Sequence, residues 1–169
     1  MKNNIDPQHD ITRSLARVLL ERGWKIALAE SCTGGLVGAI LTDLAGSSDW
    51  FERGYITYSN TAKSQCLDVP MEMIESFGAV SEQVARAMAE GARRNANVNV
   101  AISITGIAGP TGGSPEKPVG TVCFGWAINK NIQSDEVNTT VITKQFSGDR
   151  KAVREQARDY ALSKLLELL

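Results

Sequence analysis

Residues 24–46, WKIALAESCTGGLVGAILTDLAG, join a short apolar stretch to a glycine turn and then to an amphipathic segment. The first part, WKIALAE (24–30), is almost uncharged, which is typical of a strand covered on both faces. After the turn, apolar side chains recur at helical spacing, at Leu36, Ile40, Leu41 and Leu44. A buried strand that leads directly into a helix is the basic unit of an α/β sheet.

The rest of the chain continues this alternation. Apolar spacing, capping residues and turn residues predict helices over 10–22, 34–46, 60–69 (with Asn60 as its cap), 70–77, 81–95 and from 149 onward; strands are predicted over 24–30, 51–58, 98–106, 121–128 and 139–146. Early strands separated by helices imply parallel pairing, and the last two strands imply an antiparallel hairpin. We therefore predict an α/β fold, a three-layer α/β/α domain with a mixed, mostly parallel sheet, in one domain over 1–169 with a flexible leader over 1–9.

Composition and charge exclude several classes of protein. The 169 residues are 43% hydrophobic and 22% charged, with a net charge of −1, which argues against a nucleic-acid partner held by overall positive charge. No apolar run is long enough to cross a membrane, and the N-terminal MKNNIDPQHD has no apolar core of a signal peptide. We therefore expect a cytoplasmic protein without a membrane partner.

The scarcity of histidine and cysteine restricts the chemistry. Cys32, Cys66 and Cys123 are widely spaced, and His9 is the only histidine of the chain. This pattern predicts no metal site and no disulfide framework, and it leaves only His9 for a serine–histidine or cysteine–histidine pair.

Polar residues follow three predicted strands at the point where each one ends. In parallel strands these ends meet at one edge of the sheet, where α/β proteins bind their ligands. We expect the following residues to converge there: Glu30, Ser31, Cys32, Thr33, Gly34 and Gly35 after the first strand; Tyr58, Ser59, Asn60 and Lys63 after the second; Thr105 and Gly106 after the third.

The hydroxyl of Ser31 has two interpretations. Ser31 or Thr33 can simply cap the following helix, which is the commonest role of such residues. Alternatively, Ser31 is a nucleophile. The helix-start N–H groups around Thr33 to Gly35 would then hold the oxyanion that forms at the attacked carbonyl. Cys32 is the rival nucleophile, because a thiol at a helix start is acidified.

A nucleophilic serine needs a base, and Lys63 is the candidate that the strand ends bring near it. A lysine removed from water has a lowered pKa and can accept a proton, and Tyr58 can relay one. The alternative for Lys63 is a solvated helix residue. The loop 106–120 matches no known phosphate-binding signature, but its backbone N–H groups, with Lys117 or Arg150, can bind a phosphate; otherwise it is a plain surface loop.

Four long motifs resemble one known family, and they occur in its order: AESCTGG (29–35), FERGYITYSNTAK (51–63), GAVSEQVA (78–85) and SITGIAGPTGGSPEKPVGTV (103–122). From about residue 10 to the end the sequence is similar to the CinA C-terminal domain family, in its stand-alone amidohydrolase form. The resemblance implies hydrolysis of the carboxamide of nicotinamide mononucleotide to nicotinic acid mononucleotide and ammonia, in pyridine nucleotide (NAD) recycling, with no cofactor.

The resemblance also implies roles for individual residues. The family's serine and lysine fall on Ser31 and Lys63, and its auxiliary tyrosine falls on Tyr58. The expected substrate-binding residues are Glu30, Thr33, Gly34, Gly35, Ser59, Asn60, Thr105, Gly106, Ala108, Gly109 and Lys117.

Two other functions stay open at this point. One is a domain that binds a pyridine nucleotide or a protein partner without hydrolysis. The other is a metal-dependent nucleotide-phosphate hydrolase that uses carboxylates such as Glu30, Asp43 and Glu116. The leucine-rich end ALSKLLELL (161–169) has more apolar residues than one helix face needs, so we expect a surface for a homodimer contact.

Overall fold

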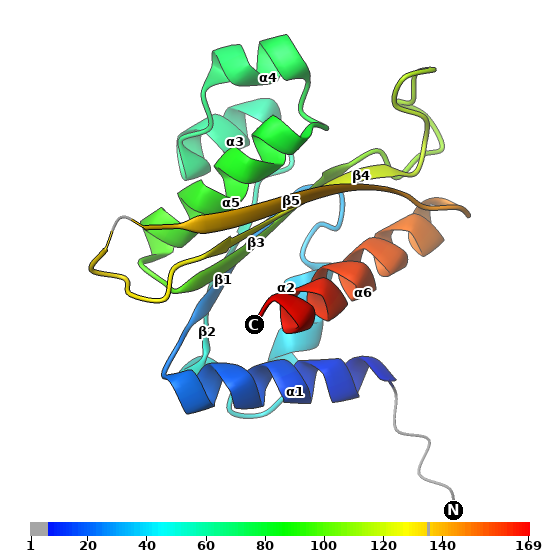
Figure 1. Cartoon of the computed structure of the whole chain (residues 1–169). Helices are drawn as coiled ribbons and strands as arrows, with labels where there is room; N and C mark the ends of the chain where they lie inside the picture. Colours follow the sequence, from blue (N-terminus) through cyan, green and yellow to red (C-terminus); the bar gives the residue numbers. More distant parts are fainter. Residues whose placement is uncertain (1–6, 135) are drawn as a thin grey trace, which may run out of the picture.

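A five-stranded sheet in the order β2-β1-β3-β4-β5 forms the middle layer of the protein (Figure 1). The structure is a computed structural model and describes residues 7–134 and 136–169. The strands are β1 (Ile26–Glu30), β2 (Phe51–Ile56), β3 (Val100–Gly106), β4 (Thr121–Ile128) and β5 (Asn138–Gln145). β1 lies between β2 and β3 and runs parallel to both, whereas β4 is antiparallel to both of its neighbours. The predicted mixed sheet with a late hairpin is therefore confirmed.

Helices cover both faces of this sheet, which confirms the three-layer prediction (Figure 1). On one face lie α1 (Pro7–Arg22), α2 (Leu36–Thr42) and α6 (Arg150–Leu168); on the other lie α3 (Asn60–Leu67), α4 (Met71–Phe77) and α5 (Glu82–Ala96). A short 3₁₀ helix, η1 (Ser47–Asp49), precedes β2. The chain leaves β1 toward β2 and returns on the opposite side to β3, so the strand order reverses at β1. A crevice at the carboxyl ends of β1 and β3 is the expected ligand site of such a sheet.

Several element boundaries differ from the sequence predictions. α1 begins at Pro7, so residues 7–9 belong to the helix and not to a leader, and residues 1–6 lie outside the described part of the chain. α2 ends at Thr42, where the threonine hydroxyl donates to the carbonyl oxygens of Gly38 and Ala39. The cap of α3 is Ser59, whose Oγ accepts from the N–H of Ala62, and not Asn60.

The two faces of the sheet are packed differently. Toward α1, α2 and α6, large side chains such as Leu28, Ile102 and Trp126 form the main core. Toward α5, β1 and β3 present the small side chains of Ala29 and Ala101. Since small side chains let a helix approach a sheet closely, α5 lies near the strands, and Ser103 Oγ donates to the carbonyl of Ala85 at 2.6 Å.

The leucine-rich C-terminal end packs within the chain itself. Leu162 and Leu165 are buried in the main core, and Leu166, Leu168 and Leu169 pack against it while partly buried. The segment therefore contributes to the core of its own chain, and the homodimer contact stays a prediction.

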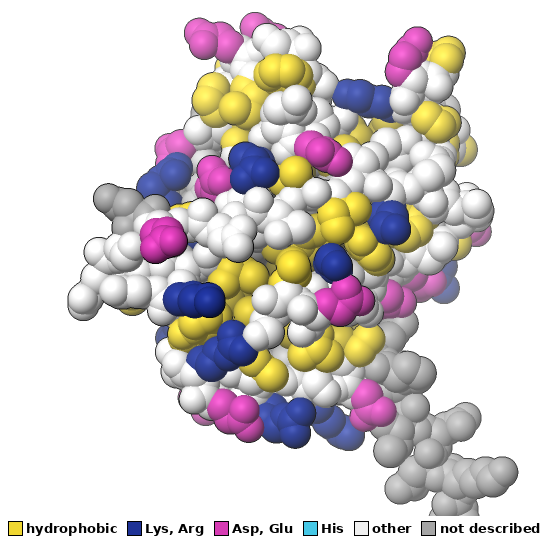
Figure 2. All heavy atoms as spheres, in the orientation of Figure 1, with side chains coloured by type: hydrophobic (Ala, Val, Ile, Leu, Met, Phe, Trp, Pro, Cys, Tyr) yellow, Lys and Arg dark blue, Asp and Glu magenta, His cyan; other side chains and the backbone are white. Residues whose placement is uncertain are grey.

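Charges of both signs are spread over the face drawn in Figure 2, where Lys and Arg side chains alternate with Asp and Glu. This face therefore carries no extended field of one sign. Within residues 7–134 and 136–169, none of the helices is both long enough and apolar enough to cross a bilayer.

Candidate active site

Ser31 lies in a tight turn directly after β1. Its N–H donates to the carbonyl of Ile104 in β3 at 2.9 Å, and its own carbonyl accepts from the N–H of Gly34 at 3.0 Å. Ser31 is 8% exposed, so the hydroxyl lies at the bottom of the crevice beyond β1 and β3. The two backbone contacts hold the serine at the end of the sheet.

The carboxylate of Glu30 holds the start of α2 through hydrogen bonds. It accepts three backbone N–H groups, those of Gly35 at 3.0 Å, Val37 at 3.2 Å and Gly38 at 2.9 Å. Gly34 and Gly35 have φ values of 58° and 99°, a region that favours glycine, and this backbone lets the helix start fold over the carboxylate. The N-cap residue of α2 is Gly35, and the carboxylate of Glu30 accepts the helix-start N–H groups, a role that was expected for Ser31 or Thr33.

These contacts correct the predicted oxyanion cradle. The N–H groups of Gly34 and Gly35 are already used by Ser31 and Glu30. In the described part of the chain, the N–H groups of Cys32 and Thr33 are the ones in this turn that donate to no backbone carbonyl and to no carboxylate. The candidate oxyanion donors therefore lie earlier in the turn than the spacing suggested.

Lys63 reaches Ser31 from α3. Its Nζ donates to Ser31 Oγ at 3.1 Å and to the backbone carbonyls of Thr57 at 2.9 Å and Tyr58 at 3.4 Å. The side chain is 1% exposed, and no carboxylate within residues 7–134 and 136–169 forms an ion pair with it. Burial lowers the pKa of Lys63 below its ordinary value, against a smaller raising effect of Cys32. The amine is thus held beside the serine in surroundings that favour its neutral form.

The rival nucleophile is in an unfavourable environment. Cys32 is buried, and this burial raises the pKa of its thiol to about 12, so the thiol stays protonated at neutral pH. A protonated thiol is a poor nucleophile, which favours Ser31 over Cys32.

Tyr58 and Arg150 meet at the rim. Arg150 Nη2 donates to Tyr58 Oη at 2.8 Å, and its Nη1 donates to the carbonyl of Gly109 in the glycine loop at 2.8 Å. Tyr58 is 59% exposed, so its ring lies at the surface of the site. Arg150, at the start of α6, connects the end of β2 to the loop 106–120.

A pocket of about 180 Å³ lies over the serine and the lysine. Its lining comes from both neighbouring strand ends, from α3 and from the loops around them: Ser31, Cys32, Tyr58, Asn60, Lys63, Ala79, Val80, Thr105, Gly106, Ala108 and Arg150. At Gly106 a Cβ would lie 2.8 Å from Val122 Cγ2 and 3.1 Å from Cys32 Sγ, so only glycine fits at this wall. Lys63 and Arg150 are the charged residues of this lining, and both are basic.

The other predicted site residues lie outside this lining. Glu30, Thr33, Gly34 and Gly35 form the supporting turn, Ser59 caps α3, and Gly109 contributes only its carbonyl to Arg150. The hydroxyl of Thr33 is buried and has no hydrogen-bond partner among the described residues.

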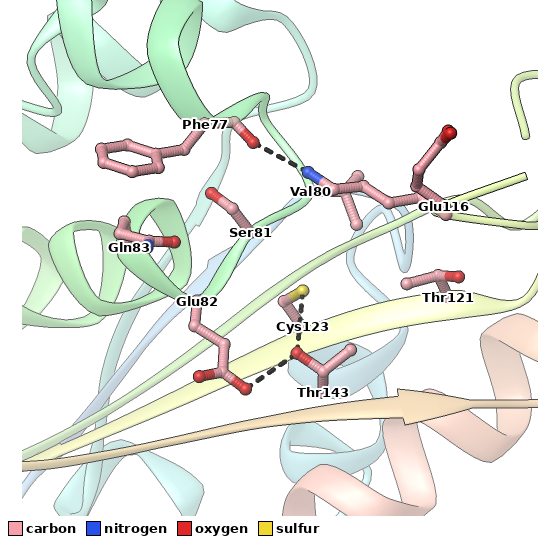
Figure 3. A pocket seen from close by; sticks show the side chains of 10 residues that line it. Phe77, Val80, Ser81, Glu82, Gln83, Glu116, Thr121, Cys123 and Thr143 are labelled. Carbon is pink, nitrogen blue, oxygen red and sulfur yellow. Dashed lines mark hydrogen bonds between the residues drawn. The ribbon is translucent and has the colours of Figure 1, made fainter. Parts of the chain in front are cut away.

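Lys117 lies in a different pocket. Its Nζ donates to the carbonyl of Phe77 at 2.8 Å. Lys117 lines a larger hollow of about 400 Å³. Figure 3 shows this hollow with Phe77 and Glu82 among its lining residues. This second hollow shares Val80 with the first pocket and holds Glu82, which accepts from Thr143 Oγ1. Lys117 is therefore directed to the carbonyl end of α4 and not to the Ser31 pocket.

Three residues were not predicted from the sequence: Ala79 and Val80, which line the pocket, and Arg154, which contacts the turn. Ala79 and Val80 belong to the motif GAVSEQVA (78–85), which was the one sequence feature that pointed to them. Their side chains are apolar, so residue type alone did not indicate a role in the site. Arg154 Nε donates to the carbonyl of Cys32 and Nη2 to that of Thr33, both at 3.0 Å, and no local sequence pattern predicts these contacts.

No group of three or more His, Cys, Asp or Glu side chains in the described ranges could hold a metal ion.

Comparisons with known proteins agree with this architecture. The crystal structure of competence damage-inducible protein A from Klebsiella pneumoniae superposes with a TM-score of 0.87 at 36% identity, over 95% of both chains. A nicotinamide-nucleotide amidohydrolase PncC from Enterobacter agglomerans is 48% identical over 158 residues, which are 94% of this chain and 93% of that protein. A CinA-like protein from Syntrophobacter fumaroxidans is 53% identical over 151 residues, which are 89% of this chain but 34% of that protein. The sequence profile described as the CinA C-terminal domain matches residues 8–169. The chain therefore belongs to the CinA C-terminal domain family.

Proposed function

We propose that this protein hydrolyses the carboxamide of nicotinamide mononucleotide to nicotinic acid mononucleotide and ammonia, in the recycling of pyridine nucleotides. The observation that carries the proposal is the buried amine of Lys63, 3.1 Å from the hydroxyl of Ser31. The 48% identical relative from Enterobacter agglomerans is named for hydrolysis of a nicotinamide nucleotide, which supports the choice of substrate. We also propose that residues 1–169 work as one catalytic domain.

The hydrogen bonds of Lys63 suit a neutral base. A neutral amine has two N–H groups and one lone pair. In the neutral amine the carbonyls of Thr57 and Tyr58 accept the two N–H groups, and the 3.1 Å contact then runs in the opposite direction, from the hydroxyl of Ser31 to the lone pair of Nζ. Burial favours this neutral state because it disfavours the charged form of an amine.

The reaction then proceeds in two balanced stages. Lys63 accepts the Ser31 proton while Oγ forms a bond to the amide carbon, and the oxyanion accepts hydrogen bonds from the N–H groups of Cys32 and Thr33. Lys63 returns the proton to the amide nitrogen as the C–N bond breaks and ammonia leaves. Water attacks the resulting ester and gives a proton to Lys63, which passes it to Ser31 Oγ as the ester C–O bond breaks and nicotinic acid mononucleotide departs.

The charge of the pocket fits an anionic substrate. Among the residues that the structure describes, its lining contains no carboxylate, and the guanidinium of Arg150 at its rim donates to Tyr58 Oη and to the carbonyl of Gly109. An arginine in this place can bind a phosphate through two hydrogen bonds. We therefore assign the 5′-phosphate to Arg150 and the loop beside it, and give Lys117 no contact with the substrate. Tyr58, which Arg150 holds at the rim, orients the substrate.

The test is release of ammonia from nicotinamide mononucleotide by the purified protein, with and without EDTA. Ser31→Ala and Lys63→Met should each lower turnover by roughly three orders of magnitude or more, because each removes a member of the nucleophile–base pair. Cys66→Ala, at an exposed cysteine, is the matched control and should keep full turnover.

Three results would contradict the proposal. Near-normal ammonia release by Ser31→Ala would exclude Ser31 as the nucleophile. Complete loss in Cys32→Ala with activity kept in Ser31→Ala would transfer the role to the thiol. Binding of nicotinamide mononucleotide by the wild type without any ammonia would favour a nucleotide sensor.

A further inference from the structure

Arg154 is the side chain that connects α6 to the turn carrying Ser31. Its Nε donates to the carbonyl of Cys32 and its Nη2 to the carbonyl of Thr33, each at 3.0 Å. These contacts join residues that are 122 and 121 positions apart in the sequence. Both acceptors belong to the turn that the mechanism uses, but Arg154 itself does not line the pocket.

The first contact determines the direction of one backbone N–H group. In a trans peptide, the N–H points opposite to the carbonyl of the same unit. The carbonyl of Cys32 and the N–H of Thr33 form such a unit, so holding the carbonyl on Arg154 turns the N–H of Thr33 away from α6. This N–H donates to no protein acceptor in the described part of the chain.

The second contact acts on the next peptide unit. The carbonyl of Thr33 faces Arg154, while the N–H of Gly34 in the same unit donates to the carbonyl of Ser31 at 3.0 Å. The turn is thereby closed by Gly34 on one side and by the guanidinium on the other. A planar guanidinium holds two acceptors at once, which the single ammonium of a lysine does not reproduce in the same geometry.

We propose that Arg154 is a positioning residue for the amidase reaction: it orients and polarises the Cys32–Thr33 peptide so that the N–H of Thr33 stabilises the oxyanion formed at the amide carbon. The inference rests on the proposed function. A cation on the carbonyl draws electron density from the peptide and makes its N–H a stronger donor. Arg154 acts through the backbone and touches no reacting atom.

The expected effect is on turnover and not on substrate binding. Removal of one oxyanion donor lowers kcat by about 100- to 1,000-fold, and a donor that is misdirected but present should lower it roughly 10- to 100-fold. Arg154→Ala should therefore lose kcat in this range with little change in KM, and Arg154→Lys should recover only part of it. Arg158→Ala, one helical turn later, is the matched control, because Arg158 Nε donates to Asp159 and not to the turn.

A purely structural anchor would also lower activity, so the experiment includes a readout specific for the oxyanion. Wild type, Arg154→Ala and Arg158→Ala are compared on nicotinamide mononucleotide and on its thioamide analogue, whose sulfur is a weak hydrogen-bond acceptor. The amide-to-thioamide rate ratio should be large in the wild type and in Arg158→Ala, and should shrink in Arg154→Ala. Added guanidinium should partly restore kcat of Arg154→Ala on the amide without changing its melting temperature.

A second reaction separates this inference from the proposed function. The burst of nitrophenolate from p-nitrophenyl acetate reports acylation of Ser31 and needs the oxyanion donor but no nucleotide. If the wild type releases no ammonia from nicotinamide mononucleotide but its burst disappears in Arg154→Ala, the substrate is wrong and the positioning role stands. An unchanged rate ratio and an unchanged burst in a folded Arg154→Ala would overturn the positioning role, and a wild type inactive in both reactions would overturn both proposals.

Discussion

Lys63 Nζ lies 3.1 Å from Ser31 Oγ, although 32 positions separate the two residues in the sequence. Ser31 follows β1 and Lys63 is on α3, and the two meet because β1 and β2 are parallel neighbours whose carboxyl ends face the same crevice. The lysine is buried with no ion-pair partner in the described residues, so its nearest polar neighbours are a hydroxyl and two carbonyls. This environment makes the pair testable by pH.

The first prediction concerns stability against pH. Burial lowers the folded-state pKa of Lys63 below 10.5, while the unfolded chain keeps the ordinary value. Below the folded pKa both states bind the proton; between the two pKa values only the unfolded state does, so the free energy of unfolding rises with pH in that window. Lys63→Met should lack this rise, as measured by urea unfolding from neutral pH to about 10. Lys130→Met, at an exposed lysine, should keep it, and equal slopes in wild type and Lys63→Met would contradict the prediction.

The second prediction concerns thiol reactivity. Cys66 is exposed, whereas Cys32 is buried and its thiol has a pKa of about 12. Under native conditions a thiol reagent should label Cys66 quickly and leave Cys32 unlabelled, with ammonia release unaffected. Cys66→Ser should then take up almost no label until the protein is unfolded. Rapid labelling of Cys32 that nicotinamide mononucleotide prevents would point to a reactive thiol in the site.

The third prediction separates support from substrate binding at Glu30. Its carboxylate accepts three N–H groups at the start of α2, and Glu30→Gln places an NH₂ group against those donors. The free energy of unfolding should fall by roughly 1–3 kcal/mol, the usual result of leaving buried hydrogen-bonding groups unpaired. KM for nicotinamide mononucleotide should change little in the folded variant. Glu72→Gln, at an exposed glutamate in the first turn of α4, is the control; a rise in KM without loss of stability would return Glu30 to the substrate site.

The fourth prediction concerns the phosphate. Hydrogen bonds to charged groups contribute about 1.5–3 kcal/mol, so Arg150→Gln should raise KM for nicotinamide mononucleotide roughly 10- to 100-fold. The effect should be much smaller for nicotinamide riboside, which lacks the phosphate. Lys117→Ala should resemble the wild type on both substrates, because Lys117 Nζ is held by the carbonyl of Phe77. Equal losses on both substrates would contradict phosphate binding and would mean that Arg150 acts by holding Tyr58.

Local patterns predicted the elements well where a single residue type determines the local backbone. Two helices were predicted to begin at Ser81 and Asp149, and both residues are helix caps, since their side chains accept from the N–H groups of Val84 and Ala152. The alternation of strands and helices was enough to predict parallel pairing and the meeting of three strand ends. The same reasoning brought Lys63 toward Ser31, and the structure has the two atoms within hydrogen-bond distance.

Hydrogen-bond partners could not be predicted in the same way. The turn after β1 contains several N–H groups, and sequence spacing does not say which of them are already used. Of the N–H groups that were expected to hold an oxyanion, Glu30 takes that of Gly35 and the carbonyl of Ser31 takes that of Gly34. Glu30 can do so because Gly34 and Gly35 fold the chain back over its carboxylate. Lys117 was assigned to the substrate phosphate from its positive charge alone. Its long side chain instead reaches the carbonyl of Phe77 at the end of α4.

The sequence by itself determined the order of the elements, the class of the sheet and the small set of residues with suitable chemistry, because these depend on hydrophobic period and on residue type. The tertiary structure alone decided that Lys63 is buried without a carboxylate, that Glu30 supports the turn, and that Arg154 approaches the turn from the far end of the chain. These features depend on distances between segments remote in sequence. Burial and hydrogen-bond partners, which set the pKa of an amine and the direction of an N–H group, exist only once those segments are packed.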